Sequence, residues 1–152
     1  MSQFTKSFRF SWAGIGKAIV TERNLRIHMV IGAYVIFFGV VGQLADWQWV
    51  VCLVCIGLVL ASELHNTALE RLCDKFTSDN NAVICFSKDV AAGGVFVSAL
   101  SAAAAGLIVF LNPDVLAVVW KNLRDHPVWV AGGFVALLAA GLYFIRGKKQ
   151  KK

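Results

Sequence analysis

Four polar side chains directly follow an apolar run in the stretch LVLASELHNTALERLCD, residues 58–74. Their spacing of i, i+3, i+7 and i+11 places them on one face of an α-helix. They are Glu63, Asn66, Glu70 and Asp74. Carboxylate and amide oxygens are ligands that Mg²⁺ prefers, and a positioned carboxylate can act as a general base. The pattern therefore predicts a helix whose end can bind a metal or accept a proton.

The depth of Glu63 along this helix indicates the edge of a membrane. Trp47 is typical of an outer membrane interface, and Glu63 follows it after 16 residues, roughly 24 Å at about 1.5 Å per residue. A hydrocarbon core about 30 Å thick would leave Glu63 just inside the inner boundary, with Glu70 further towards the cytoplasm. Because ionisable groups at this depth are costly to bury, they usually serve a function.

Two other segments bring polar side chains to the same expected level. TERNLRIH precedes one apolar span, and SKDVAAGG begins another. Their polar residues are Glu22, Asn24, Arg26 and His28 in the first segment, and Lys88 and Asp89 in the second. Lys88 could meet a phosphate group as a point charge. The alternative is that all of these residues are solvated helix ends held by a few ion pairs.

The elements that must position these residues are apolar spans. Of the 152 residues, 58% are hydrophobic, which is too apolar for a soluble domain of this size. We expect an all-α integral membrane protein whose spans approach the roughly 20 residues that cross a bilayer. The core, residues 1–112, would contain membrane helices at about 27–44, 47–76 and 86–111. An outer connection at 113–126, with a short helix at 115–123, would lead to an additional membrane helix and basic tail at 127–152.

Residues 3–24 are predicted to form an amphipathic helix that lies in the membrane interface. An apolar stripe recurs at helical spacing, whereas Lys6, Arg9 and Lys17 occupy other faces. The stripe consists of Phe4, Phe8, Trp12, Ile15 and Ile19. The alternative is an amphipathic helix that packs on its own bundle. In the span at 86–111, the small residues of SALSAAAAG favour close helix contacts, so we expect that span at the centre of the packing.

The positive charges predict the orientation. With both termini in the cytoplasm, all of the fifteen lysines and arginines except Lys121 and Arg124 lie on the inner side. The net charge of +6 is then explained by topology and anionic lipid, and no nucleic-acid partner is needed. No G-x-x-x-x-G-K-[ST] motif, no H-R-D or D-F-G pair and no H-E-x-x-H motif occurs, so the common soluble kinase and metalloprotease sites are excluded.

The blocks ELHNTALERLCD and KDVAAGGV resemble the family of small prokaryotic diacylglycerol and undecaprenol kinases. The segment ERNLRIH is similar to the N-terminal signature of the undecaprenol kinases in that family. The resemblance covers about residues 8–111. It implies a homotrimer in the bacterial inner membrane, with active sites shared between neighbouring subunits. It also implies transfer of the γ-phosphate of ATP to a lipid hydroxyl, with Mg²⁺ as cofactor.

The resemblance also implies roles for individual residues. Glu63 would be the general base, and Glu22 and Glu70 would hold Mg²⁺. The residues expected around ATP are Phe10, Glu22, Asn66, Glu70, Asp74, Asp79, Asn80, Asn81, Lys88 and Asp89. Those expected around the lipid substrate are Asn24, Arg26, His28 and Glu63. Two features depart from the family, namely the segment 127–152 and Phe10, which stands where a tyrosine can stack near the adenine.

Two other functions are compatible with a small apolar chain. A cation transporter would use acidic residues along its pathway, but it would need them near the middle of the membrane. A non-catalytic membrane assembly protein would need only the small-residue span. The lipid also stays open between an undecaprenol and a diacylglycerol.

Overall fold

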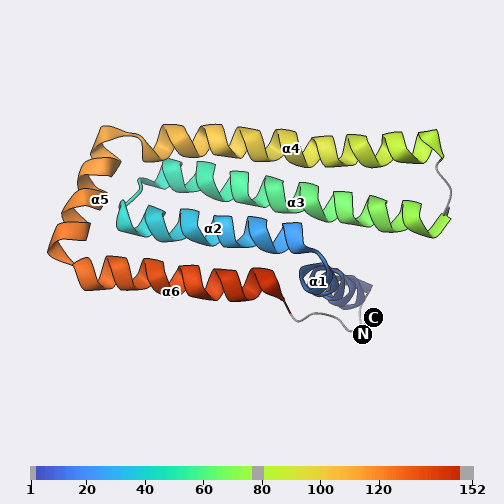
Figure 1. The fold of residues 1–152 in the computed structure, drawn as a ribbon, viewed down its shortest axis with the longest axis horizontal. Helices are drawn as coiled ribbons and strands as arrows, with labels where there is room; N and C mark the ends of the chain where they lie inside the picture. The colour runs from blue at the N-terminus through green and yellow to red at the C-terminus, as the bar shows by residue number, and fades with distance from the viewer. Residues whose placement is uncertain (1–2, 77–80, 148–152) are drawn as a thin grey trace.

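The computed structural model describes residues 3–76 and 81–147, and six helices make up almost all of them. In chain order these are α1 (Gln3–Thr21), α2 (Arg23–Val41), α3 (Asp46–Phe76), α4 (Ala82–Phe110), α5 (Pro113–Asp125) and α6 (Pro127–Arg146). The described ranges contain no strand, which confirms the all-α prediction. In Figure 1, α4, α3, α2 and α6 lie side by side in a row, α5 crosses one end of it, and α1 lies at the other.

A single extended residue separates the surface helix from the first membrane helix. Glu22 has φ −98° and ψ 115°, so the helical hydrogen-bond pattern stops at Thr21 and restarts at Arg23. The sequence pattern predicts the end of the surface helix at 24 and the start of the membrane helix at about 27. The break falls earlier, and it puts Glu22 itself at the elbow between α1 and α2.

Asparagine side chains start two of the later helices. The Oδ1 of Asn81 accepts a hydrogen bond from the Val83 N–H at 2.9 Å, so α4 begins before the predicted residue 86. The Oδ1 of Asn112 caps α5 in the same way through the Asp114 N–H at 2.9 Å, with proline at the first helical position. These caps satisfy backbone donors that a helix start leaves free. As a result α5 is longer than the predicted 115–123.

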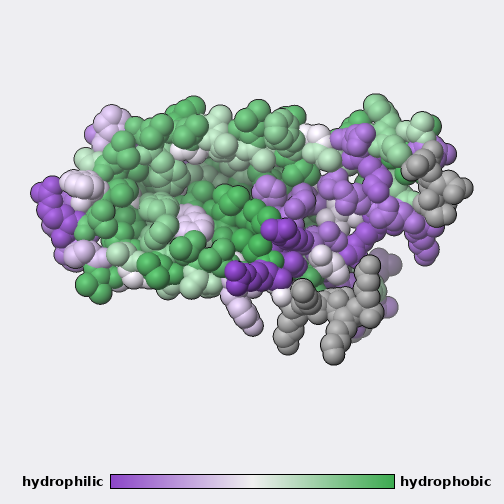
Figure 2. All heavy atoms as spheres, in the orientation of Figure 1, coloured by the Kyte–Doolittle hydropathy of each residue, from purple (hydrophilic) through white to green (hydrophobic). Residues whose placement is uncertain are grey.

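Four helices, α2, α3, α4 and α6, are long and apolar enough to cross a membrane, so the chain is a membrane protein. α3 has 31 residues, which corresponds to about 46 Å at 1.5 Å per residue and exceeds a hydrocarbon core of about 30 Å. Figure 2 shows apolar atoms over the middle of the row and polar atoms at its two ends. The larger polar end is formed by α1 and the projecting ends of α3 and α4.

Helix α4 lies at the edge of the row rather than at its centre (Figure 1). It packs along α3, but a Cβ added at Gly93, Gly94 or Gly106 would meet no atom within 4 Å. The expectation that this span is central to the packing is therefore wrong for a single chain. Its small residues instead leave a face of α4 on which another helix could pack closely.

Helix α6 packs on the side of α2 that α3 leaves free. The ring of Phe134 lies 5.7 Å from that of Tyr34 and 6.0 Å from that of Phe38, measured between centroids. One turn nearer the start of α6, Trp129 stacks on Phe37 at 6.3 Å. Aromatic pairs at these separations add to the stabilisation that comes from dispersion contacts. The segment after residue 110 is thus attached to the core through α2.

Helix α5 closes the end of the row opposite to α1. The side-chain N–H of Asn122 donates to the backbone oxygen of Val41 at 2.8 Å, which satisfies a carbonyl at the end of α2. Val115 joins Leu44, Cys52 and Val109 in the main buried apolar cluster of the described chain. This end of the molecule therefore has a packed core, whereas the other end is polar.

We predict that Gly141→Ala weakens the attachment of α6. A Cβ at Gly141 would lie 2.8 Å from Cγ1 of Val30, a β-branched side chain that cannot easily rotate away. The substitution should lower the free energy of unfolding by about 1–3 kcal/mol, the usual cost of overpacking. Thermal unfolding of the purified protein in detergent would measure the change. Gly132→Ala is the control, because a Cβ there meets no atom within 4 Å; equal melting temperatures for the two variants would contradict the packing.

Candidate active site

The four polar residues of α3 lie on one continuous helix and become more exposed along it. Glu63 is buried, with 3% of its surface exposed, and Asn66 is buried as well. Glu70 is half-buried, and the Asp74 side chain is 65% exposed. The side-chain N–H of Asn66 donates to Oε1 of Glu70 at 3.1 Å. The helix therefore carries its polar groups from an enclosed position to an open one.

The first predicted cluster reaches the same place from the start of α2. His28 and Glu22 both lie near enough to Glu63 to act on its charge, as does Glu70 on α3. The carboxylate of Glu22 accepts hydrogen bonds from Arg71 at 2.8 Å and from the Thr21 hydroxyl at 3.0 Å. Arg71 also donates to the Thr21 hydroxyl. The elbow between α1 and α2 is thereby joined to α3 beside Glu70.

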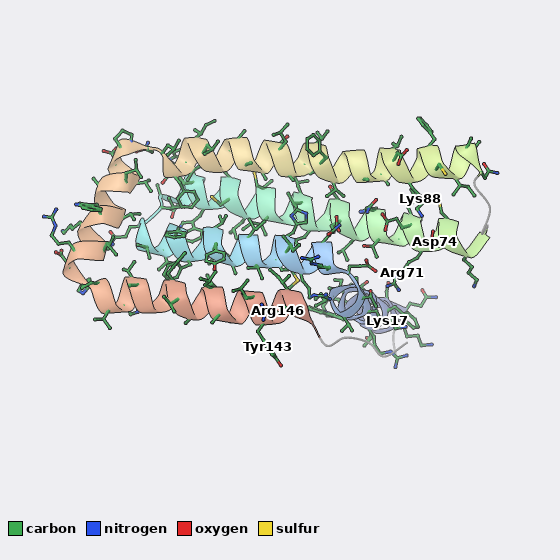
Figure 3. The ribbon with its side chains drawn as sticks, viewed as in Figure 1. Lys17, Arg71, Asp74, Lys88, Tyr143 and Arg146 are labelled. Carbon is green, nitrogen blue, oxygen red and sulfur yellow. The ribbon has the colours of Figure 1, made fainter. Side chains whose placement is uncertain are left out.

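The second cluster reaches α3 from the start of α4. Lys88 Nζ lies 2.7 Å from Oδ1 of Asp74, and the two side chains point towards each other in Figure 3. Glu70 also acts on the charge of Lys88. Since Glu70 lies within electrostatic reach of Glu63 as well, it links the buried and the exposed parts of the site. The three predicted segments thus all reach α3, but at different heights, because the Lys88–Asp74 pair lies about 16 Å beyond Glu63 along the helix axis at 1.5 Å per residue.

Other predicted site residues have different surroundings. Asn81 caps α4, and Asp89 and Asn24 are exposed. Phe10 lies under the guanidinium of Arg9, with Cζ 5.6 Å from the ring centroid. Phe10 lies about 18 Å from Glu22 along the axis of α1 at 1.5 Å per residue, so one chain does not bring Phe10 and Glu22 together. Asp79 and Asn80 lie outside the described residues.

Arg26 is buried and engaged with backbone rather than open to a ligand. Its Nη1 donates to the carbonyl oxygens of Ile19 at 2.8 Å and Val20 at 2.9 Å. These carbonyls belong to the last turn of α1 and would otherwise lack partners. Gly147, which follows α6 with φ 58°, lies against the same guanidinium, since a Cβ there would be 3.2 Å from Nη2. Arg26 therefore fixes the elbow that carries Glu22.

An apolar groove of about 260 Å³ leads along the bundle towards Glu63. Residues of α2, α3 and α4 line it. One of them is His28, which belongs to the same segment at the start of α2 as Glu22. On α3 the lining extends as far as Val59, and Glu63 follows one helical turn later on the same face. An apolar chain in this groove could place a polar head beside the Glu63 carboxylate.

The residues of the polar end suit a hard divalent cation that keeps part of its shell for other oxygens. Among residues 3–76 and 81–147, no three His, Cys, Asp or Glu side chains gather closely enough to enclose a metal. Asn66 Oδ1, however, is buried without a hydrogen-bond partner in the described chain, and its amide nitrogen is bonded to Glu70. One or two carboxylates with phosphate or water oxygens is the usual arrangement for Mg²⁺.

Sequence reasoning did not single out Arg71, although it makes the ion pair that connects α3 to the elbow. The available signal was its position directly after Glu70, on the side of the helix that faces the N-terminal segment. The family resemblance implied a lipid contact for Arg26, and nothing in the local sequence indicated that its guanidinium binds the backbone of α1.

Comparisons with known proteins identify the family of the chain. The family model described as prokaryotic diacylglycerol kinase matches residues 9–110. Undecaprenol kinase of Bacillus subtilis is 33% identical over 111 residues, which cover 73% of this chain and 90% of that relative. Diacylglycerol kinase of Synechocystis sp. is 36% identical over 108 residues, which cover 70% of this chain and 62% of that relative. No solved structure matches. The chain therefore belongs to the prokaryotic diacylglycerol kinase family.

Proposed function

We propose that the protein is a lipid kinase that transfers the γ-phosphate of ATP to the hydroxyl of a membrane lipid, an undecaprenol or a diacylglycerol. The observation that carries this proposal is the position of Glu63. It is buried one helical turn beyond Val59, the last α3 residue that lines the apolar groove, on a helix that continues to the half-buried Glu70 and the exposed Asp74. The acids gather at one end of the bundle and not at its middle, which favours a kinase over a cation transporter. Membership of the kinase family also favours it over an assembly protein.

The lipid would lie with its chain in the apolar groove and its hydroxyl beside Glu63. Glu63 accepts the hydroxyl proton while the lipid oxygen attacks the γ-phosphorus. The bond from the γ-phosphorus to the bridging oxygen breaks, and ADP leaves with that oxygen. Phosphoryl transfer depends mainly on positioning and charge stabilisation, so one base at the correct depth is the only proton acceptor that the protein would need to supply. His28, which lines the groove, and Asn24 would contact the lipid head, and Arg26 would act there through the position that it gives to α2.

Nucleotide would approach from the exposed side of the site. Lys88 would turn from Asp74 to the phosphates, with Asp89 and Asn81 nearby on α4. Phe10, Asp79 and Asn80 stay proposed nucleotide contacts. Glu22 and Glu70 would hold Mg²⁺, with the free oxygen of Asn66 beside them. When bound, Mg²⁺ would neutralise charge on the phosphates.

The polar end of the bundle would face the bacterial cytoplasm, where ATP is available. The basic residues of α1, of the ends of α3 and α4, and of the chain after α6 would then lie on the inner side of the inner membrane. Both termini are cytoplasmic in this arrangement, because four membrane helices return the chain to its starting side. A reporter fused after Lys152 that proved periplasmic would contradict this orientation.

In a homotrimer with shared sites, residues of two subunits could contact one nucleotide. Within one chain the proposed nucleotide contacts Phe10 and Glu22 are too far apart to do so. The distance from Phe10 to Glu22 along α1 and the uncovered small-residue face of α4 support this arrangement. Native mass spectrometry from detergent, with kinase activity measured on the same fractions, should find the activity in the trimer. An active monomer would contradict shared sites.

Glu63→Gln should abolish turnover while nucleotide binding largely survives. The amide keeps the shape of the side chain but cannot accept the proton, so the rate should fall by about 10²- to 10⁴-fold. Steady-state kinase assays and equilibrium binding of ATP would measure the two properties. Asp114→Asn, at the far end of the bundle on α5, is the matched control. A rate above about a tenth of wild type would exclude Glu63 as the base.

Glu22→Gln and Glu70→Gln should act on nucleotide affinity instead. Each removes a negative oxygen ligand from the proposed Mg²⁺ site, so both should weaken binding of Mg²⁺-ATP and raise the Mg²⁺ concentration needed for activity. Magnesium titrations at several ATP concentrations would separate this effect from a loss of folding. If both variants bound Mg²⁺-ATP as tightly as wild type, the metal ligands would lie elsewhere.

A further inference from the structure

A second groove lies between α1 and α3, outside the residues assigned to the kinase site so far. It encloses about 500 Å³ and is open to solvent. Its lining consists of Ala13, Gly16, Lys17, Val20, Thr21 and Arg71. Two of these residues are cationic, one carries a hydroxyl, and none is acidic. Figure 3 shows Lys17 and Arg71 at the same end of the bundle as the Asp74–Lys88 pair.

Arg71 connects this groove to the proposed metal ligands. Its Nη2 contacts both the Glu22 carboxylate and the Thr21 hydroxyl, and it directly follows Glu70 in sequence. The described contacts use only this one nitrogen of the guanidinium. Because the side chain is 53% exposed, its other N–H groups can reach an acceptor in the groove without leaving Glu22. Guanidinium groups bind phosphate oxygens in this forked manner.

Gly16 leaves the wall of the groove open along α1. A Cβ at this position would have no atom within 4 Å. Because glycine has no side chain, a ligand in the groove can approach the backbone of α1 closely at this position. Lys17 is the next residue and also lines the groove, so the open backbone and a positive charge occur together.

We propose that this groove binds the phosphate chain of the nucleotide, with Arg71 and Lys17 as its ligands. This inference rests on the proposed function, because it takes Glu22 to be part of the Mg²⁺-ATP site. The polyphosphate would run from the metal ligands, past the Glu22–Arg71 contact and into the groove. A phosphate on a lipid head has the same chemistry, but ATP carries more negative charge and arrives from the solvent side, to which the groove opens.

A steric test fills the groove without changing any charge. Gly16→Leu should weaken binding of the non-hydrolysable analogue β,γ-methylene-ATP with Mg²⁺ by about tenfold, similar to the loss of one charge-assisted hydrogen bond. Gly14→Leu is the matched control, since Gly14 also has open space but does not line the groove. Leucine is a better helix former than glycine, so neither variant should lose α1. Equal affinities for the two variants would overturn the proposal.

A double-mutant cycle tests whether Arg71 contacts the phosphates or only orders Glu22. Arg71→Gln should weaken analogue binding by about tenfold, both alone and in a Glu22→Gln background. Lys75→Gln, which removes an exposed charge one turn further along α3, should have little effect. If Arg71→Gln had no further effect once Glu22 was replaced, Arg71 would act only on Glu22, and the proposal would be wrong.

Two further results separate this proposal from its alternatives. In Arg71→Gln, the lipid phosphate product could inhibit the enzyme more weakly while the affinity for the ATP analogue stayed unchanged. That result would assign the groove to a lipid head and overturn the proposal. If Glu22→Gln alone left Mg²⁺-analogue binding unchanged, the metal assignment would fail. The proposal that Arg71 binds the phosphates would still be tested by the analogue affinities of Arg71→Gln and Gly16→Leu, each as a single substitution.

Discussion

Burial of the Glu63 carboxylate is the constraint on which the candidate site depends. A charged group removed from water is costly unless it has partners, and a position near the hydrocarbon boundary offers few of them. The chain places Glu63 only a few residues from the point where α3 becomes exposed, and it brings His28 from α2 within electrostatic reach. Because α3 is longer than the hydrocarbon core, one rigid helix can hold both the buried Glu63 carboxylate and the exposed residues beyond it.

The elbow between α1 and α2 is the second part of this arrangement. Glu22 is the extended residue at the elbow, and its position is set by two arginines. Arg26 binds the last carbonyls of α1 from within the fold, and Arg71 reaches Glu22 from α3. α5 and α6 lie beyond the region shared with the family, yet they brace α2 along its free side. The extension therefore supports the helix that carries His28 without supplying a reacting group.

Periodicity and hydropathy were enough to predict most of the helices and the shared face of Glu63, Asn66 and Glu70. These properties depend on neighbours within one helix, which the sequence displays directly. The break at Glu22 was misplaced, because no proline or glycine marks it. The engagement of Arg26, the Glu22–Arg71 pair and the edge position of α4 were not foreseen. Each of them arises from contacts between segments that are distant in sequence, and no local pattern encodes such contacts.

The most direct test measures transfer of the γ-phosphate of ATP to a membrane lipid. The purified protein would be reconstituted in vesicles that contain an undecaprenol or a diacylglycerol, and supplied with Mg²⁺ and ATP labelled in its γ-phosphate. Label should enter one of these lipids as a phosphate monoester, in an amount equal to the ADP formed. Release of inorganic phosphate without labelled lipid, or no turnover with either lipid, would contradict the proposed function.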